Sequence, residues 1–557
     1  MREWLRETHG PFFELLRHFL RRFFDSELIT HTENTAPALV GVFSMMLPWA
    51  MLIVQPLYFK YAHFSHLPTA APYLHAVRAD QLWLLTLNMA AMGLVVSIKW
   101  ESLFPGRLDY HALGSLPLRT SQLFYAKLTA LLAVATAAIA VLAALPTLLF
   151  PAVSASRWQM NPSLRAHVWA HAVSTIAGCY FFLFALVALE GVLLNLLPPR
   201  AFQRIAGVLQ GVLTALMLLL MVLSFSIQPR TADSLLRPAL AAWLPPVWYL
   251  GLYQAMLGDS APAMQWLAQR AEWGLAMAVA LALVTYLGSY RRHQKLLVEG
   301  AVHAAGDRRW PGYLFDRLVG DPRQQAIIAF VSKTLAASSR HRMVLMGYAG
   351  FGAAIVLTGV LEMKDVAAAF VYAHIVVLTF LLIGVRHLFT IPCELRANWT
   401  FQISERQGRE AWLRAMDRLV LTAGAFAVVL LPLPLEWRLL GWHAPAEAAM
   451  AAAFGLLCYE AVFASWDKLP FTCSSLPGKT PAWIKALQLL AVVTALDAIH
   501  HLLLICLELP ALYAVVFTAL ITAAVGLRHF RRAAWSELRL KYDEAPEPAI
   551  HGLNLRS

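Results

Sequence analysis

The chain has 557 residues, of which 59% are hydrophobic and only 14% are charged. Soluble globular domains carry about 25% charged residues, so this balance excludes an ordinary soluble protein. The formal net charge of +12 would suit nucleic-acid binding, but the positions of Lys and Arg along the chain give the charge another meaning.

The first predicted element is an amphipathic helix over residues 12–24. Its Phe and Leu residues fall on one helical stripe, while Glu, His and Arg occupy the other face. This pattern is typical of a helix that lies in the headgroup layer of a membrane. A helix packed on a soluble partner is the alternative.

About twelve apolar stretches follow, each roughly 20 residues long, the length with which a helix crosses a bilayer. With the N-terminus inside, only nine of the 45 Lys and Arg lie on the outer side. Cytoplasmic loops retain Lys and Arg, so we expect a multi-pass protein of the plasma membrane (a bacterial inner membrane), with both termini cytoplasmic and no nucleic-acid partner. The predicted spans are 38–59, 81–98, 123–150, 166–194, 206–226, 272–290, 343–361, 367–386, 417–435, 447–466, 484–506 and 510–528.

The two halves of the chain have the same predicted layout. Asp321 and Pro322 are a suitable N-cap and first-turn pair for a second amphipathic helix, which precedes the seventh span as 12–24 precedes the first. Repeated units of this kind are common in transporters. We therefore predict an all-α fold with a first six-span half (1–290), a cytoplasmic linker (291–320), a second six-span half (321–530) and a cytoplasmic tail (531–557).

The inner loop after the second span carries a recognisable set of residues: Asp109, Leu113, Leu116, Pro117, Arg119, Phe124 and Lys127. With the surface helix and the spans that follow it, this loop resembles the membrane subunits of ABC-2 type transporters, the permease partners of ATP-binding cassette ATPases. The resemblance covers residues 1–226, and extends to the second half by layout alone.

The resemblance implies a permease, here an exporter of an unidentified substrate, powered by a separate cytoplasmic ATPase in two copies. ATP and Mg would bind to that partner, and no cofactor is expected in this chain. Asp109, Leu113, Leu116, Pro117, Arg119 and Lys127 would form the docking loop. The chain departs from the family pattern in joining two units, and its second docking loop, with Arg396, Trp399 and Arg414, lacks the Leu-Pro element.

No nucleotide-binding motif is predicted in the chain itself. Gly478, Lys479 and Thr480 match the end of a phosphate-binding loop, but Cys473 stands where that loop needs a glycine. We expect no catalytic residues and no enzymatic activity.

Four ionisable residues inside spans are candidates for a gate or for coupling: Glu190, Glu460, Asp497 and His501. The favoured interpretation for the two glutamates is pairing with a basic residue at an inner span end, such as Lys127 or Arg418. Asp497 and His501, one turn apart, suit a proton relay or half a metal site, but a buried hydrogen-bonded pair is the favoured interpretation. No metal site is predicted, and His171 and His374 are expected to be packing residues.

Two other function classes stay open. One is a twelve-span secondary transporter driven by protons through Asp497 and His501. The other is an integral-membrane transferase acting on a lipid-linked substrate, for which the predicted outer loop 60–80 offers Asp80 and three histidines.

Overall fold

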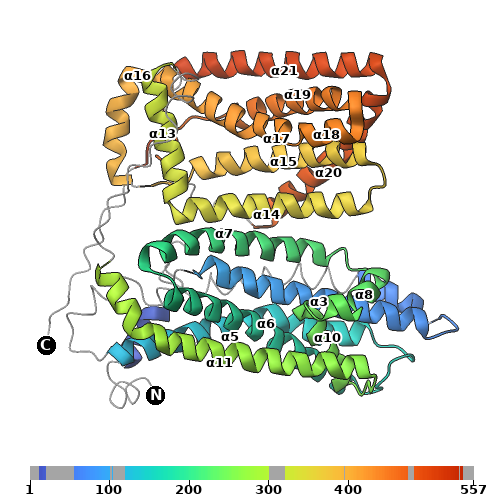
Figure 1. Ribbon diagram of the computed structural model, residues 1–557. Helices are drawn as coiled ribbons and strands as arrows, with labels where there is room; N and C mark the ends of the chain where they lie inside the picture. Colours follow the sequence, from blue (N-terminus) through green and yellow to red (C-terminus); the bar gives the residue numbers. More distant parts are fainter. Residues whose placement is uncertain are drawn as a thin grey trace. The chain divides into compact units, whose positions relative to one another are not determined.

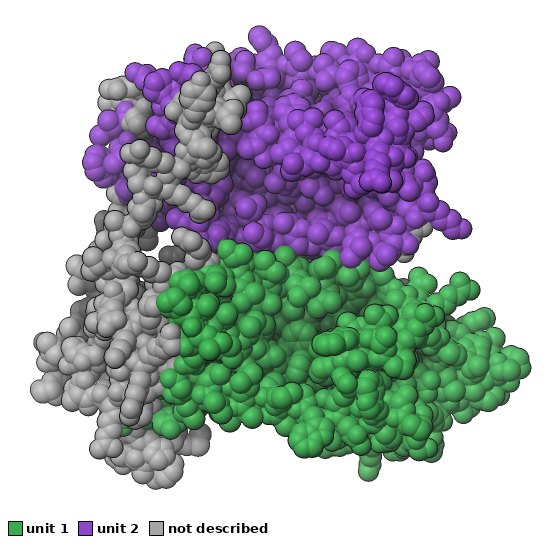
Figure 2. Space-filling model, viewed as in Figure 1, with its two compact units in different colours: residues 1–306 green, residues 307–557 purple. Residues whose placement is uncertain are grey.

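The computed structural model describes residues 12–20, 56–64, 66–100, 103, 120–299, 320–393, 395–473, 482–537 and 540–543. Across these ranges the elements are helices, and no β-strand is present. The predicted all-α class is therefore confirmed. The chain divides into two compact units, Met1–Gly306 and Asp307–Ser557, shown in green and purple in Figure 2. The division falls within the predicted linker 291–320.

Ten segments of the described residues are long and apolar enough to cross a membrane, as expected of a multi-pass membrane protein. They overlap eleven of the predicted spans, because one run of 55 residues overlaps both the ninth and the tenth. The first predicted span, 38–59, lies almost wholly outside the described residues, so the count of twelve stays a prediction. The segments are Ala71–Ile98, Gln122–Val153, Leu164–Leu196, Ile205–Ser224, Pro262–Gly288, Arg340–Leu361, Val366–Phe389, Arg409–Phe463, Ala491–Glu508 and Pro510–Trp535.

Helix α6 (Leu164–Leu196) is the central helix of the first unit (Figure 1). Its close contact with α11 depends on Gly191, where an added Cβ would lie 2.4 Å from Oγ1 of Thr285. Only glycine lets two helices approach this closely. The other helices of the unit are α3 (Ala71–Ile98), α5 (Thr120–Val153), α7 (Pro199–Ser224), α8 (Pro229–Leu235), α9 (Pro238–Ala241), α10 (Pro245–Met256) and α11 (Pro262–Glu299).

Residues 12–20 are helical and amphipathic, as predicted, while 21–24 lie outside the described residues. Leu15 and Phe19 are buried in one apolar cluster with Leu123 and Phe124 of α5. Their burial shows that the apolar face of this helix packs on its own unit.

Helices α15 (Val366–Phe389) and α19 (Ala444–Phe463) form the centre of the second unit, because each contacts several neighbouring helices. In Figure 1, α13 and α16 run across the ends of the long helices of this unit. We call this end the α16 end and the opposite end the α18 end; the predicted topology places the α16 end in the cytoplasm. The other elements are α13 (Pro322–Ala337), α14 (Ser339–Glu362), η2 (Leu395–Ala397), α16 (Asn398–Arg418), η3 (Leu419–Phe426), α17 (Ala427–Leu430), α18 (Leu433–Leu440), η4 (Gly441–His443), α20 (Ala482–Glu508) and α21 (Pro510–Glu537).

Candidate functional site at the α16 end of the second unit

Helices α13 and α16 form a two-helix layer held by aromatic side chains. Phe330 of α13 contacts Phe401 and Trp412 of α16, with ring centroids 5.4 and 6.4 Å apart. At the start of α13 the Asp321 carboxylate accepts the backbone N–H of Arg323 at 3.0 Å. This hydrogen bond holds the pKa of the Asp321 carboxyl below its ordinary value, so the predicted N-cap is present and charged at neutral pH.

The start of α16 is tied to two distant parts of the chain. The buried Asn398 side chain donates to the backbone carbonyls of Thr472 and Asp543, each at 2.7 Å. Close by, the Lys541 ammonium pairs with the Asp467 carboxylate at 2.5 Å. These contacts join α16, the loop after α19 and the segment 540–543 into one assembly.

The end of α16 is anchored by a buried group of charges that we call the Arg531 cluster: Asp417, Tyr459, Glu460 and Arg531. Nε of Arg531 donates to Oε2 of Glu460 at 2.7 Å, and its Nη2 donates to Oδ1 of Asp417 at 2.9 Å. The Tyr459 hydroxyl donates to the same Oδ1 at 2.6 Å. At most 5% of each charged side chain is exposed, so these hydrogen bonds form away from water, where they are strong.

The Arg531 cluster joins three helices, because Asp417 belongs to α16, Glu460 to α19 and Arg531 to α21. Two further guanidinium groups, those of Arg528 and Arg532, approach the same carboxylates at 3.6–3.9 Å. Three arginines thus face two carboxylates, and the negative charges are neutralised. The end of α16 is therefore tied directly to α19 and α21.

A π-helix, η3, follows the cluster directly and extends for eight residues, Leu419–Phe426. π-Helices are rare; they mostly occur as single turns inside α-helices, and frequently at functional sites. Its position, between the exposed part of α16 and the short helix α17, makes η3 a candidate hinge.

The free surface of α16 carries apolar side chains. Trp399 and Ile403, one helical turn apart, are 62% and 59% exposed within the unit. Arg414, predicted for the second docking loop, is half exposed and pairs with Glu410 of the same helix at 2.8 Å. The predicted Arg396 lies in η2, and its side chain is outside the described part of the structure. The loop predicted from the sequence is thus mostly a helix.

The first predicted docking loop lies almost wholly outside the described residues, which include none of Asp109, Leu113, Leu116, Pro117 and Arg119. Lys127 is described, and it is buried at the start of α5. Its Nζ lies 4.8 Å from the centroid of the Phe19 ring, a cation–π contact that attaches the N-terminal helix to α5.

The two intramembrane glutamates are both buried. As expected, Glu460 pairs with basic residues. Its partners are Arg531 and Arg528, not Arg418. Arg528 and Arg531 reach Glu460 because α21 packs beside α19 and brings its last turns against it. Glu190 lies on α6, next to the contact between Gly191 and α11.

The interpretation of Asp497 and His501 as a buried hydrogen-bonded pair is wrong. Their nearest charged atoms are 3.9 Å apart, and about two thirds of each side chain is exposed. The spacing along α20 places them on one face as expected, but that face is turned outward within the unit.

Asp80 is predicted to lie in the outer loop 60–80, but in the structure it lies within α3, which begins at Ala71. Its carboxylate is buried and pairs with Lys60 at 2.7 Å, while the Tyr61 hydroxyl donates to it at 2.6 Å. Burial, reinforced by Asp80, raises the pKa of the Tyr61 hydroxyl, which therefore stays protonated as a donor. These contacts are those of a structural ion pair.

The two histidines expected to pack have different surroundings. His171 is buried between the rings of Phe150 and Tyr253, as expected. His374 instead lies between the carboxylates of Glu436 and Glu447, a group that the sequence analysis missed. Both glutamates lie at the ends of predicted spans, next to a connecting loop. The feature of the sequence that could have indicated the group is His374, a histidine inside the preceding span.

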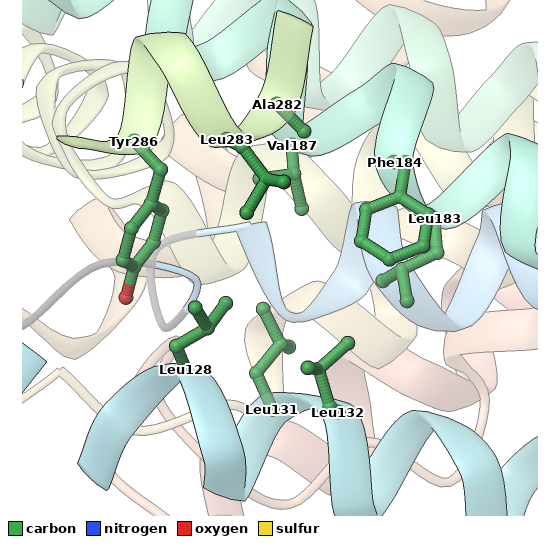
Figure 3. Close-up of a pocket in the computed structure, with 9 residues that line it drawn as sticks. All are labelled: Leu128, Leu131, Leu132, Leu183, Phe184, Val187, Ala282, Leu283 and Tyr286. Carbon is green, nitrogen blue, oxygen red and sulfur yellow. The ribbon is translucent and has the colours of Figure 1, made fainter. Parts of the chain in front are cut away.

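The first unit contains an apolar pocket between α5, α6 and α11 (Figure 3). Apart from the Tyr286 hydroxyl, its lining is hydrocarbon, so it offers no group for acid–base chemistry. The lining residues are Leu128, Leu131, Leu132, Leu183, Phe184, Val187, Ala282, Leu283 and Tyr286.

In comparisons with known proteins, no family model, no curated protein and no solved structure matches the chain.

Proposed function

We propose that this protein is the membrane-spanning permease of an ABC transporter, an exporter powered by a separate cytoplasmic ATPase, with both termini in the cytoplasm of a bacterial inner membrane. Two ATPase copies would bind ATP and Mg and dock on the α16 surface and on the loop that contains Asp109 and Arg119. The substrate is unidentified.

One observation carries the proposal: α16 combines an exposed apolar face with a buried ionic anchor. Trp399 and Ile403 offer a surface for a partner at one end of the helix. At the other end, Asp417 holds α19 and α21 through Arg531. A helix built in this way receives a push from outside the membrane and passes it to membrane-spanning helices.

The mechanism follows from the same contacts. Closure of the ATPase on ATP would favour one position of α16, and that shift in population would move α19 and α21 through the Arg531 cluster. The π-helix η3 would absorb the change in helix geometry between α16 and α17. In the first unit, the buried Glu190 is the candidate for the role that Glu460 has in the second unit.

Photo-crosslinking from α16 tests the proposal in native membranes. Ile403→p-benzoylphenylalanine should cross-link to a soluble protein that contains a phosphate-binding loop, and purified chain should stimulate ATP hydrolysis by that protein. The matched control is Trp243→p-benzoylphenylalanine, at a position that is 83% exposed but predicted to face outward.

Two results would contradict the proposal. The first is cross-linking of Ile403 to lipid alone, with no ATPase captured. The second is transport that stops when the proton gradient is collapsed but survives the loss of cellular ATP, which is the behaviour of a secondary transporter.

A further inference from the structure

Three buried side chains meet at the α18 end of the second unit: His374 of α15, Glu436 of α18 and Glu447 of α19. Nδ1 of His374 lies 2.8 Å from Oε1 of Glu447, and Nε2 lies 3.3 Å from Oε1 of Glu436. No more than 4% of any of these side chains is exposed. We call this group the His374 cluster.

The His374 cluster has two carboxyl groups and one imidazole. With both carboxyls ionised it keeps a charge of −1 even when the imidazole is protonated, so either a cation balances that charge or a carboxyl takes up a proton. Among the described residues, neither glutamate forms an ion pair with a Lys or Arg. Both oxygens of Glu436 and Oε2 of Glu447 are buried without a hydrogen-bond partner. Burying such a charge is expensive unless it is paired or coordinates a metal.

Local helix geometry offsets only part of this cost. Glu436 and Glu447 lie in the first turns of α18 and α19, where the helix dipole favours a carboxylate. That contribution is about 0.3–1 kcal/mol per residue, against several kcal/mol for a buried ion. A cation between the carboxylates would balance the remaining charge.

The distances favour a particular arrangement of ligands. In a tetrahedral zinc site with bonds of about 2.1 Å, two ligand atoms are about 3.4 Å apart. The separation between Nε2 of His374 and Oε1 of Glu436, 3.3 Å, fits two ligands of one ion. The shorter contact from Nδ1 to Glu447 fits the hydrogen bond by which a carboxylate orients a metal-bound histidine.

We propose that the His374 cluster binds one divalent transition-metal ion of the zinc class. Nε2 of His374 and the carboxylate of Glu436 are the ligands. Glu447 orients the imidazole through Oε1, and water would fill the remaining coordination positions. An imidazole with carboxylates suits zinc, manganese or iron, whereas calcium and magnesium prefer oxygen alone. The ion would hold α15, α18 and α19 together, and this proposal does not depend on the proposed function.

The test uses the full chain, purified in detergent with a tag that contains no histidine and stripped with a chelator. Zinc is titrated against a competing fluorescent chelator. We expect one tight site per chain and a higher unfolding temperature with zinc. Glu436→Gln and His374→Gln should abolish tight binding, and Glu447→Gln should weaken it by about 10–100-fold.

Two control variants separate this site from adventitious binding. Glu410→Gln removes an exposed carboxylate, and Asp497→Asn with His501→Gln removes a second, exposed group with metal-ligand spacing. Both should leave the tight site unchanged. Glu447→Gln keeps the test informative if Glu436→Gln fails to fold. The proposal is overturned if the wild-type chain binds no stoichiometric zinc, or if the tight site disappears with Asp497 and His501 instead.

Discussion

The substitution Arg531→Met should strongly destabilise the second unit. Arg531 supplies the short hydrogen bonds to both carboxylates of its cluster, and methionine keeps an unbranched chain but no charge. Asp417 and Glu460 would then stay buried, with the Tyr459 hydroxyl still donating to Asp417 but only the longer contacts from Arg528 and Arg532 to balance their charge. Removing one partner of a buried ion pair leaves an uncompensated charge, and this charge is the main source of the cost.

The expected magnitude follows from the burial of the group. Breaking a buried ion pair costs about 3–5 kcal/mol of folding free energy. Each kcal/mol lowers the unfolding temperature of a unit of this size by about 2–4 °C. We therefore expect the unfolding temperature to fall by about 6–20 °C. Arg528→Met is the matched control on the same helix. Arg528 is 36% exposed and its ion-pair contacts are at least 3.8 Å long, so its loss should cost less than about 1 kcal/mol.

Thermal unfolding of the purified chain in detergent, followed by tryptophan fluorescence, measures the effect. A triple variant, Arg531→Met with Asp417→Asn and Glu460→Gln, should recover a large part of the loss, because no buried carboxylate then needs a partner. Equal shifts for Arg531→Met and Arg528→Met, or a triple variant no better than the single one, would refute the reasoning.

Three further predictions concern the α16 end and the first docking loop. Arg119→Glu with Pro117→Ala should abolish co-purification of the ATPase while membrane insertion, measured by fractionation, is unchanged. Asn398→Asp keeps the shape of the side chain but removes both donors, so it should cost about 1–3 kcal/mol, measured as a lower unfolding temperature. Because the pKa of Asp321 is depressed, its cap acts fully above the ordinary Asp value and is lost as pH falls through the folded-state pKa. The start of α13 should therefore fray below about pH 4, as seen by hydrogen exchange corrected for intrinsic rates.

Each of these predictions has a clear contrary result. Unchanged co-purification would remove Arg119 and Pro117 from the docking surface. An Asn398→Asp variant as stable as the wild type would show that its two hydrogen bonds contribute nothing net. For Asp321, the comparison is Asp321→Ala, in which α13 should be frayed at all pH values; a pH response that persists in this variant would have another source.

The helices could be predicted from the sequence because an apolar stretch of span length has few alternatives in a membrane. Contacts between spans could not, because they depend on which face each helix turns toward its neighbours. Asp497 and His501 have the right spacing but the wrong face. The predicted cytoplasmic tail begins at Arg531. In the structure α21 continues to Glu537, and the Arg531 side chain is buried.

The His374 cluster shows that the position of a charged residue in the sequence does not by itself predict whether its side chain is solvated. Glu436 and Glu447 stand on either side of a predicted loop, where carboxylates are ordinarily solvated. In the structure the chain turns back at Gly441, whose φ of 58° is uncommon for other residues, and the turn brings both carboxylates over His374. Only the path of the backbone reveals that these three residues share one site.

The π-helix η3 has a consequence for the register of the chain. In an α-helix each residue turns the chain by about 100°, and a π-helical turn accommodates one extra residue without breaking the helix. If a π-turn of η3 became α-helical, the helix on one side of it would shift by one residue, which is a rotation of about 100°, relative to the helix on the other side. The segment before η3 contains Asp417, and the segment after it leads to α18 and Glu436. One short stretch therefore offers a discrete step of rotation between α16 and the segment that leads to α18.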